Sequence, residues 1–114
     1  MILTGKAKED FERWLYSNDV LIKDGIYDAT YLIEGFDELP LNLQYASIIE
    51  WFDSVGIYIS INYVDFYDEL RNDTGFETYV TNKGLSVKFR SVSSRQETIK
   101  QAIKKANEIY NNKN

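Results

Sequence analysis

The feature that most constrains the fold is a change of hydrophobic period at Gly56. Before this glycine, apolar residues repeat at spacings of three and four, which predicts a helix that begins at Pro40 and ends at Gly56. After it, apolar and polar residues alternate up to residue 64, which predicts a strand with one buried face. The helical stripe consists of Leu41, Tyr45, Ile48, Ile49, Phe52 and Val55.

Two more segments have the composition of strands. They run from Phe76 to Thr81 and from residue 85 to 90, and Asn82-Lys83-Gly84 between them is typical of a tight turn because Asn and Gly tolerate a positive φ. We therefore expect a hairpin. A long acidic connection is expected between residues 65 and 75, so the sheet should be three-stranded and antiparallel.

Further helices are expected on both sides of this region. Thr4 is positioned to cap a helix over residues 5–16, and a short helix is expected over residues 28–34. Ser94 and Glu97 match a capping box that opens a helix over residues 95–111. Together, these elements predict one α+β domain over residues 1–114. Their order is α-(α)-α-β-β-β-α, where the parentheses mark the short helix over residues 28–34.

The chain contains neither cysteine nor histidine. It therefore lacks the usual proton shuttle at neutral pH, the thiol nucleophile and the softer ligands of zinc and copper. No glycine-rich phosphate loop of the GxGxxG or GxxxxGK[ST] kind occurs. We expect a protein that is not an enzyme and needs no cofactor.

The acidic connection is the one place where hard cations such as Ca²⁺ could find several oxygen ligands. Three apolar side chains interrupt the series, however, and the spacing matches no calcium loop. A solvated loop is the favoured interpretation, and no metal site is predicted. The carboxylates concerned are Asp65, Asp68, Glu69 and Asp73.

The net charge of −5, from 18 acidic and 13 basic residues, disfavours general binding to nucleic acids or to anionic membranes. No apolar run approaches the roughly 18 residues that span a bilayer, and the first residues do not resemble a signal peptide. These features predict a cytoplasmic protein without a membrane segment.

Two groups of residues are candidates for ligand binding. One lies on the outward face of the predicted sheet, where rings, amides and cations could stack a base or hold a phosphate; alternatively, a helix such as the first covers this face, or the face is simply solvated. The other is the start of the last helix, Ser94 and Arg95, where backbone N–H groups attract anions; alternatively, it is only a structural cap. The sheet residues are Tyr58, Asn62, Tyr79, Lys88 and Arg90.

Three stretches carry a resemblance to a known group: residues 3–11, residues 39–46 leading into 51–57, and residues 94–97 leading into 102–111. They resemble small uncharacterised proteins encoded by phages and prophages, and are similar to the type called ABA sandwiches. The sequence departs from the pattern between Val20 and Phe36, and at Gln96, where proline would be expected. The resemblance implies a small phage accessory protein in the host cell, and carries over no site residues.

Three functions follow as hypotheses. The first is a non-enzymatic accessory protein that binds a host or phage macromolecule, with a host-takeover or anti-defence role, through an exposed aromatic and acidic surface. The second is a protein that binds or sequesters a nucleotide-like anion, which requires Lys88, Arg90, Arg95 and a tyrosine to converge on one concave site. The third is a self-assembling structural accessory protein, such as a homodimer formed through a strand edge.

Overall fold

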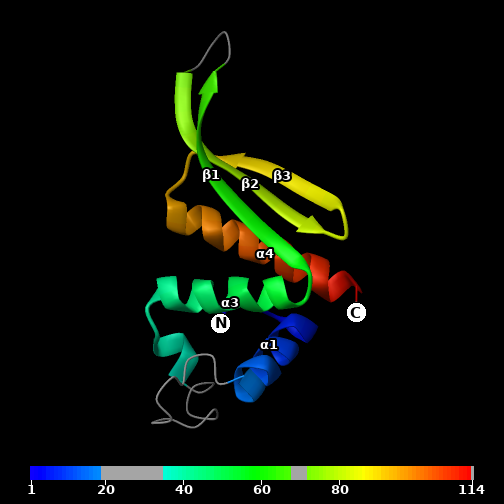
Figure 1. Cartoon of the computed structure of the whole chain (residues 1–114). Helices are drawn as coiled ribbons and strands as arrows, with labels where there is room; N and C mark the ends of the chain where they lie inside the picture. Colours follow the sequence, from blue (N-terminus) through cyan, green and yellow to red (C-terminus); the bar gives the residue numbers. More distant parts are fainter. Residues whose placement is uncertain (19–34, 68–71, 114) are drawn as a thin grey trace.

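The computed structural model describes residues 1–18, 35–67 and 72–113 (Figure 1). It confirms the α+β class, the three-stranded antiparallel sheet and the order of helices and strands. The short helix expected over residues 28–34 lies outside the described residues. The elements are α1 (Gly5–Asn18), the 3-10 turn η1 (Phe36–Glu38), α3 (Leu41–Ser54), β1 (Ile57–Tyr67), β2 (Asn72–Asn82), β3 (Leu85–Ser91) and α4 (Arg95–Lys113).

The sheet has the strand order β1-β2-β3, with both pairs antiparallel. The predicted tight turn is present between β2 and β3, where Lys83 and Gly84 have φ values of 52° and 81°. Two consecutive positive φ angles define the turn that best matches the twist of a two-residue hairpin.

The acidic connection was expected over residues 65–75, and this length was wrong because both strands extend into it. The β1–β2 ladder continues from the pair Ile57–Asn82 to the pair Tyr67–Asn72, and Asp65 lies opposite Thr74 within it. Phe66 and Tyr67 are aromatic residues of the kind that favours strands, and an antiparallel neighbour can satisfy the backbone groups of such a segment. Over the described residues, no group of three or more acidic side chains is placed to hold a metal ion.

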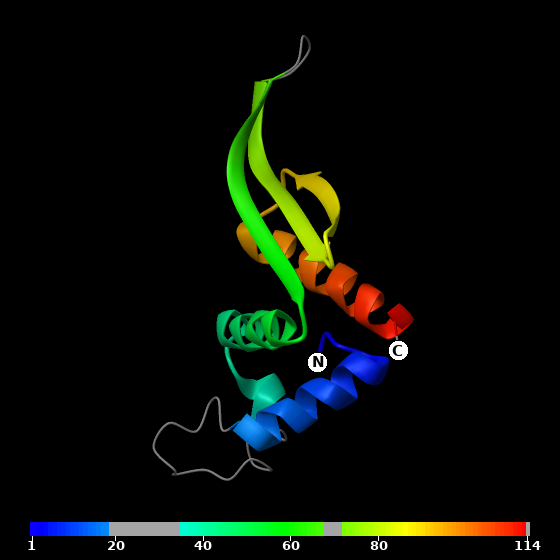
Figure 2. The same ribbon diagram turned by 45° about the vertical axis from the view of Figure 1, so that its right-hand side comes forward.

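The helices lie on one side of the sheet in two tiers (Figures 1 and 2). α3 contacts β1, and α4 contacts both β1 and β2, while α1 packs against α3 and α4 on the side away from the sheet. Among the described elements, no helix lies on the opposite face of the sheet. In the part of the chain that the structure describes, no helix has both the length and the apolar character needed to cross a membrane.

The core confirms the predicted α3 stripe at Tyr45, Ile48 and Phe52, which are buried, whereas Leu41 is 44% exposed. Ala102, Ile103 and Ala106 of α4 are fully buried beneath the sheet. Trp51 of α3, absent from the predicted stripe, is buried as well, and its ring lies 5.8 Å from that of Phe11 and 5.0 Å from that of Tyr110. Trp51 thus joins α3 to both α1 and α4.

The start of α1 is held by the far end of the chain. Asn111 of α4 accepts a hydrogen bond from the Ala7 N–H at 2.8 Å and donates one to the Thr4 carbonyl at 3.0 Å. Asn107 accepts from the Thr4 N–H and donates to the Thr4 hydroxyl, both at 3.0 Å. The expectation that Thr4 caps α1 was therefore wrong, because Asn111 supplies the oxygen that an N-cap side chain would offer.

A second polar link joins α4 to α1. The Tyr110 hydroxyl donates to Asp10 Oδ2 at 2.5 Å, and Lys6 and Arg13 flank the same carboxylate. Burial, together with the hydrogen bond and the negative charge of Asp10, raises the pKa of Tyr110 from 10.0 to about 12. The same hydroxyl, followed by Lys6 and Arg13, holds the pKa of the Asp10 carboxyl below its ordinary value.

We expect this link to weaken in alkali. Between pH 10 and about 12 the unfolded chain ionises Tyr110 while the folded protein keeps it protonated, so the stabilisation present below pH 10 is lost as the pH rises. The difference in the free energy of unfolding between wild type and Tyr110→Phe should therefore shrink from pH 8 to pH 11.5. Urea denaturation at both values measures it, and a difference that does not change would contradict the assignment.

Candidate functional site

The outward face of the sheet carries the five residues expected there. Ser60, Tyr79 and Lys88 lie side by side across the three strands, and so do Asn62, Glu77 and Arg90. Tyr58 lies one step along β1, opposite Thr81. The alternative in which the first helix covers this face does not hold, because α1 packs on the helical side of the molecule.

Glu77 contacts three neighbouring side chains on this face, and it was not among the site residues predicted from the sequence. The Tyr79 hydroxyl donates to Glu77 Oε1 at 2.6 Å, Arg90 Nε donates to Oε2 at 3.3 Å, and Lys88 Nζ lies 3.6 Å from Oε1. Lys88 also lies over the Tyr79 ring, 5.7 Å from its centroid. The Tyr79 hydrogen bond, followed by the two cations, lowers the pKa of Glu77. Lys88 and Arg90 are therefore partly neutralised within the protein itself.

The other predicted site residues lie elsewhere. Ser94 accepts a hydrogen bond from the Glu97 N–H at 3.1 Å, so it caps α4 as the predicted capping box requires. The Arg95 guanidinium lies 5.1 Å from the centroid of the Phe76 ring. Phe76 is on the helical side of the sheet, in register with Tyr63, whereas Arg90 is on the outward side. The structure therefore does not bring Arg95 together with Lys88 and Arg90.

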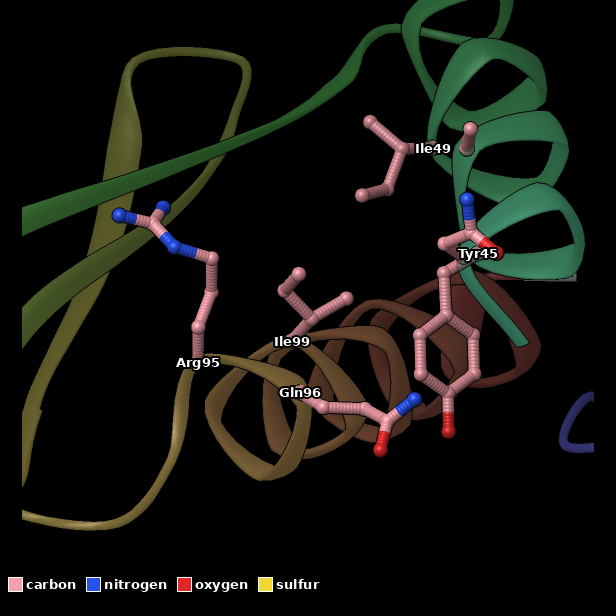
Figure 3. A pocket seen from close by; sticks show the side chains of 7 residues that line it. Tyr45, Ile49, Arg95, Gln96 and Ile99 are labelled. Carbon is pink, nitrogen blue, oxygen red and sulfur yellow. The ribbon is translucent and has the colours of Figure 1, made fainter. Parts of the chain in front are cut away.

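Arg95 instead lines a pocket between α3 and the first turns of α4, which we call the α3/α4 pocket (Figure 3). Ile49 and Ile99 point into it from the two helices, while Arg95 lies on the side of the strands and Tyr45 on the opposite side. Its volume is about 390 Å³. The lining residues are Asn42, Tyr45, Ala46, Ile49, Arg95, Gln96 and Ile99.

The free edge of β3 is a second feature of note. Leu85, Val87 and Phe89 lie on the helical side of the sheet, opposite Asn82, Val80 and Thr78 of β2. α4 contacts β1 and β2, and it leaves Leu85 79% and Val87 38% exposed, whereas Val80 is fully buried. In the described parts of the chain no strand pairs with the outer edge of β3, so β3 presents apolar side chains next to an open strand edge.

The aromatic surface expected from composition does not form among the described residues. The most exposed rings belong to Tyr16, Tyr58 and Tyr63. Tyr16 is on α1, and the two β1 tyrosines point to opposite faces of the sheet because an odd number of positions separates them. The exposed aliphatic side chains of the described residues are Leu85 and Val87 on β3, Val92 after it, and Leu41 and Leu43 on α3.

Comparisons of the chain with models of known protein families, with curated proteins and with solved structures found no match.

Proposed function

We propose that the protein is a non-enzymatic binding module that recognises an extended segment of another protein by adding it as a fourth strand beside β3. The observation that carries this proposal is the pairing of an open strand edge with the exposed Leu85 and Val87. Natural sheets normally blunt or cover such edges, because they bind other strands. The resemblance to phage-encoded proteins supports a host or phage protein as the partner.

Backbone groups for strand addition are available at three positions. Asn82 and Leu85 close the two-residue turn, so the N–H and C=O groups of Leu85 point toward β2. Because these directions alternate along a strand, the groups of Ser86, Lys88 and Arg90 point away from the sheet. An added strand would bond to these three residues, as in other complexes formed by strand addition.

The two faces of β3 also specify the side chains that fit. On the helical side, apolar side chains of a partner would continue the row of Leu85 and Val87. On the outward side, the cationic side chains of Lys88 and Arg90 are 46% and 58% exposed and would lie beside the added strand. The partner segment should therefore alternate apolar residues with acidic ones.

A designed peptide in which valine alternates with glutamate tests the proposal. It should slow amide hydrogen exchange at Ser86, Lys88 and Arg90 of β3, because their outward N–H groups would become bonded. Ser86→Pro should weaken binding by about tenfold, since it removes an outward donor without removing a bond to β2. Lys88→Gln should weaken it less, through loss of charge.

The matched controls are a peptide of the same composition in a scrambled order and the variant Lys83→Gln. Lys83 carries the same charge as Lys88 but lies in the turn, beyond the paired residues. The proposal fails if the scrambled peptide protects the β3 amides equally, or if Ser86→Pro binds the alternating peptide as tightly as wild type.

Self-pairing of β3 is the second candidate, and the symmetry of the strand favours it. With Val87 on a twofold axis, Leu85 would face Phe89 of the second copy, and Ser86 would face Lys88. This register avoids placing two Lys88 side chains directly opposite each other. Light scattering distinguishes the candidates, because a homodimer would double the mass at micromolar concentration without any peptide and would protect the same amides.

A further inference from the structure

The α3/α4 pocket is separate from the β3 edge and has the features of a small-molecule site. Its volume of about 390 Å³ falls within the range of known ligand pockets. Tyr45, Ala46, Ile49 and Ile99 provide the apolar surface, and the amides of Asn42 and Gln96 provide polar groups. None of the lining residues is acidic. Such a pocket can enclose an apolar body and orient it with few polar contacts.

Arg95 gives the pocket its charge. The ion pairs among the described residues use the amino terminus and five cationic side chains, and Arg95 is not among them. Phe76 holds the guanidinium by a cation–π contact, 5.1 Å from the ring centroid. Because this contact already restricts the side chain, binding an anion would cost less ordering than it would for a free arginine.

We infer that the α3/α4 pocket binds a small amphipathic carboxylate. Its apolar body would lie between Ile49 and Ile99, and its carboxylate would pair with Arg95, whose planar guanidinium matches two carboxylate oxygens. The lining has only one cationic side chain. A ligand with one negative charge is therefore balanced, whereas the phosphates of a nucleotide would leave negative charge uncompensated beside an apolar wall.

Two probes of equal size and different charge test this inference: 2-naphthoate, which is an anion, and 2-naphthylmethanol, which is neutral. Titrations are followed by NMR on the isoleucine methyl groups, where Ile49 and Ile99 report on the pocket and Ile57 on the buried core. We expect shifts at Ile49 and Ile99, with naphthoate bound about fivefold to tenfold more tightly than the alcohol.

Three variants assign the contacts. Arg95→Gln should bind both probes with the affinity that wild type has for the alcohol. Ala46→Phe should weaken both, because the larger side chain fills the pocket, and its melting temperature checks that it still folds. Lys100→Gln removes one charge from the same helix outside the pocket lining and should keep the preference for naphthoate.

The inference is overturned if naphthoate shifts methyl groups elsewhere without affecting Ile49 and Ile99. It is also overturned if Arg95→Gln retains the preference for the anion, or if Lys100→Gln loses it as completely as Arg95→Gln does. Absence of binding by both probes at millimolar concentration would likewise contradict it.

Discussion

Phe11→Ala should lower the free energy of unfolding by about 3 to 5 kcal/mol, which is the usual cost of removing a fully buried phenylalanine. Phe11 is completely buried, and its ring meets those of Phe36 and Trp51 edge to face at 5.2 and 5.8 Å. The substitution would leave a cavity where α1, η1 and α3 come together. Urea denaturation followed by tryptophan fluorescence measures the effect, because Trp51 lies at the site.

Two further variants serve as controls for this prediction. Tyr16→Ala removes an aromatic ring from the same helix at a side chain that is 60% exposed, and should change stability by no more than about 0.5 kcal/mol. Phe11→Leu keeps most of the apolar volume and should lose less than Phe11→Ala. If Phe11→Ala and Tyr16→Ala proved equally mild, Phe11 would not lie at the centre of the core.

Asn111→Ala should destabilise the protein by about 1 to 3 kcal/mol, because it leaves the Ala7 N–H and the Thr4 carbonyl without their side-chain partner. The amide protons of Thr4 and Ala7 should also exchange faster with solvent. Measurement combines urea denaturation with hydrogen exchange resolved by NMR.

Asn112→Ala is the matched control for this prediction. It makes the same substitution on the same helix at an exposed position, so its effect on helix propensity is equal and its effect on stability should stay near zero. Equal losses from the two variants would mean that the bonds between Asn111 and the start of α1 contribute nothing beyond helix propensity.

Local patterns were enough to predict most of the fold. The stripe ending at Gly56, the alternation after it and the Lys83-Gly84 turn each correspond to an element in the structure. What could not be predicted depends on residues distant in sequence. Thr4 has the side chain of a helix cap, yet the oxygen that binds the Ala7 N–H comes from Asn111, and no local pattern indicates that choice.

Part of the candidate site could also be predicted from local sequence patterns. Alternation placed Tyr58, Tyr79 and Lys88 on one face, because side chains two positions apart in a strand point the same way. Glu77 was within reach of this reasoning, since a turn at Lys83-Gly84 sets residue 77 opposite residue 90. The exposure of Leu85 depends on how far α4 extends across the sheet, and sequence periodicity carries no information about that.

The bonds from Asn107 and Asn111 to the beginning of α1 also bear on how the protein is made. Thr4 and Asn107 are 103 positions apart, so the ribosome must translate all of the residues between them before they can meet. Until then the apolar side of α1 lacks α4, one of its two helical packing partners. α1 should therefore reach its final packing only after α4 has been made, and a nascent chain stalled before α4 should be open to proteases around Phe11.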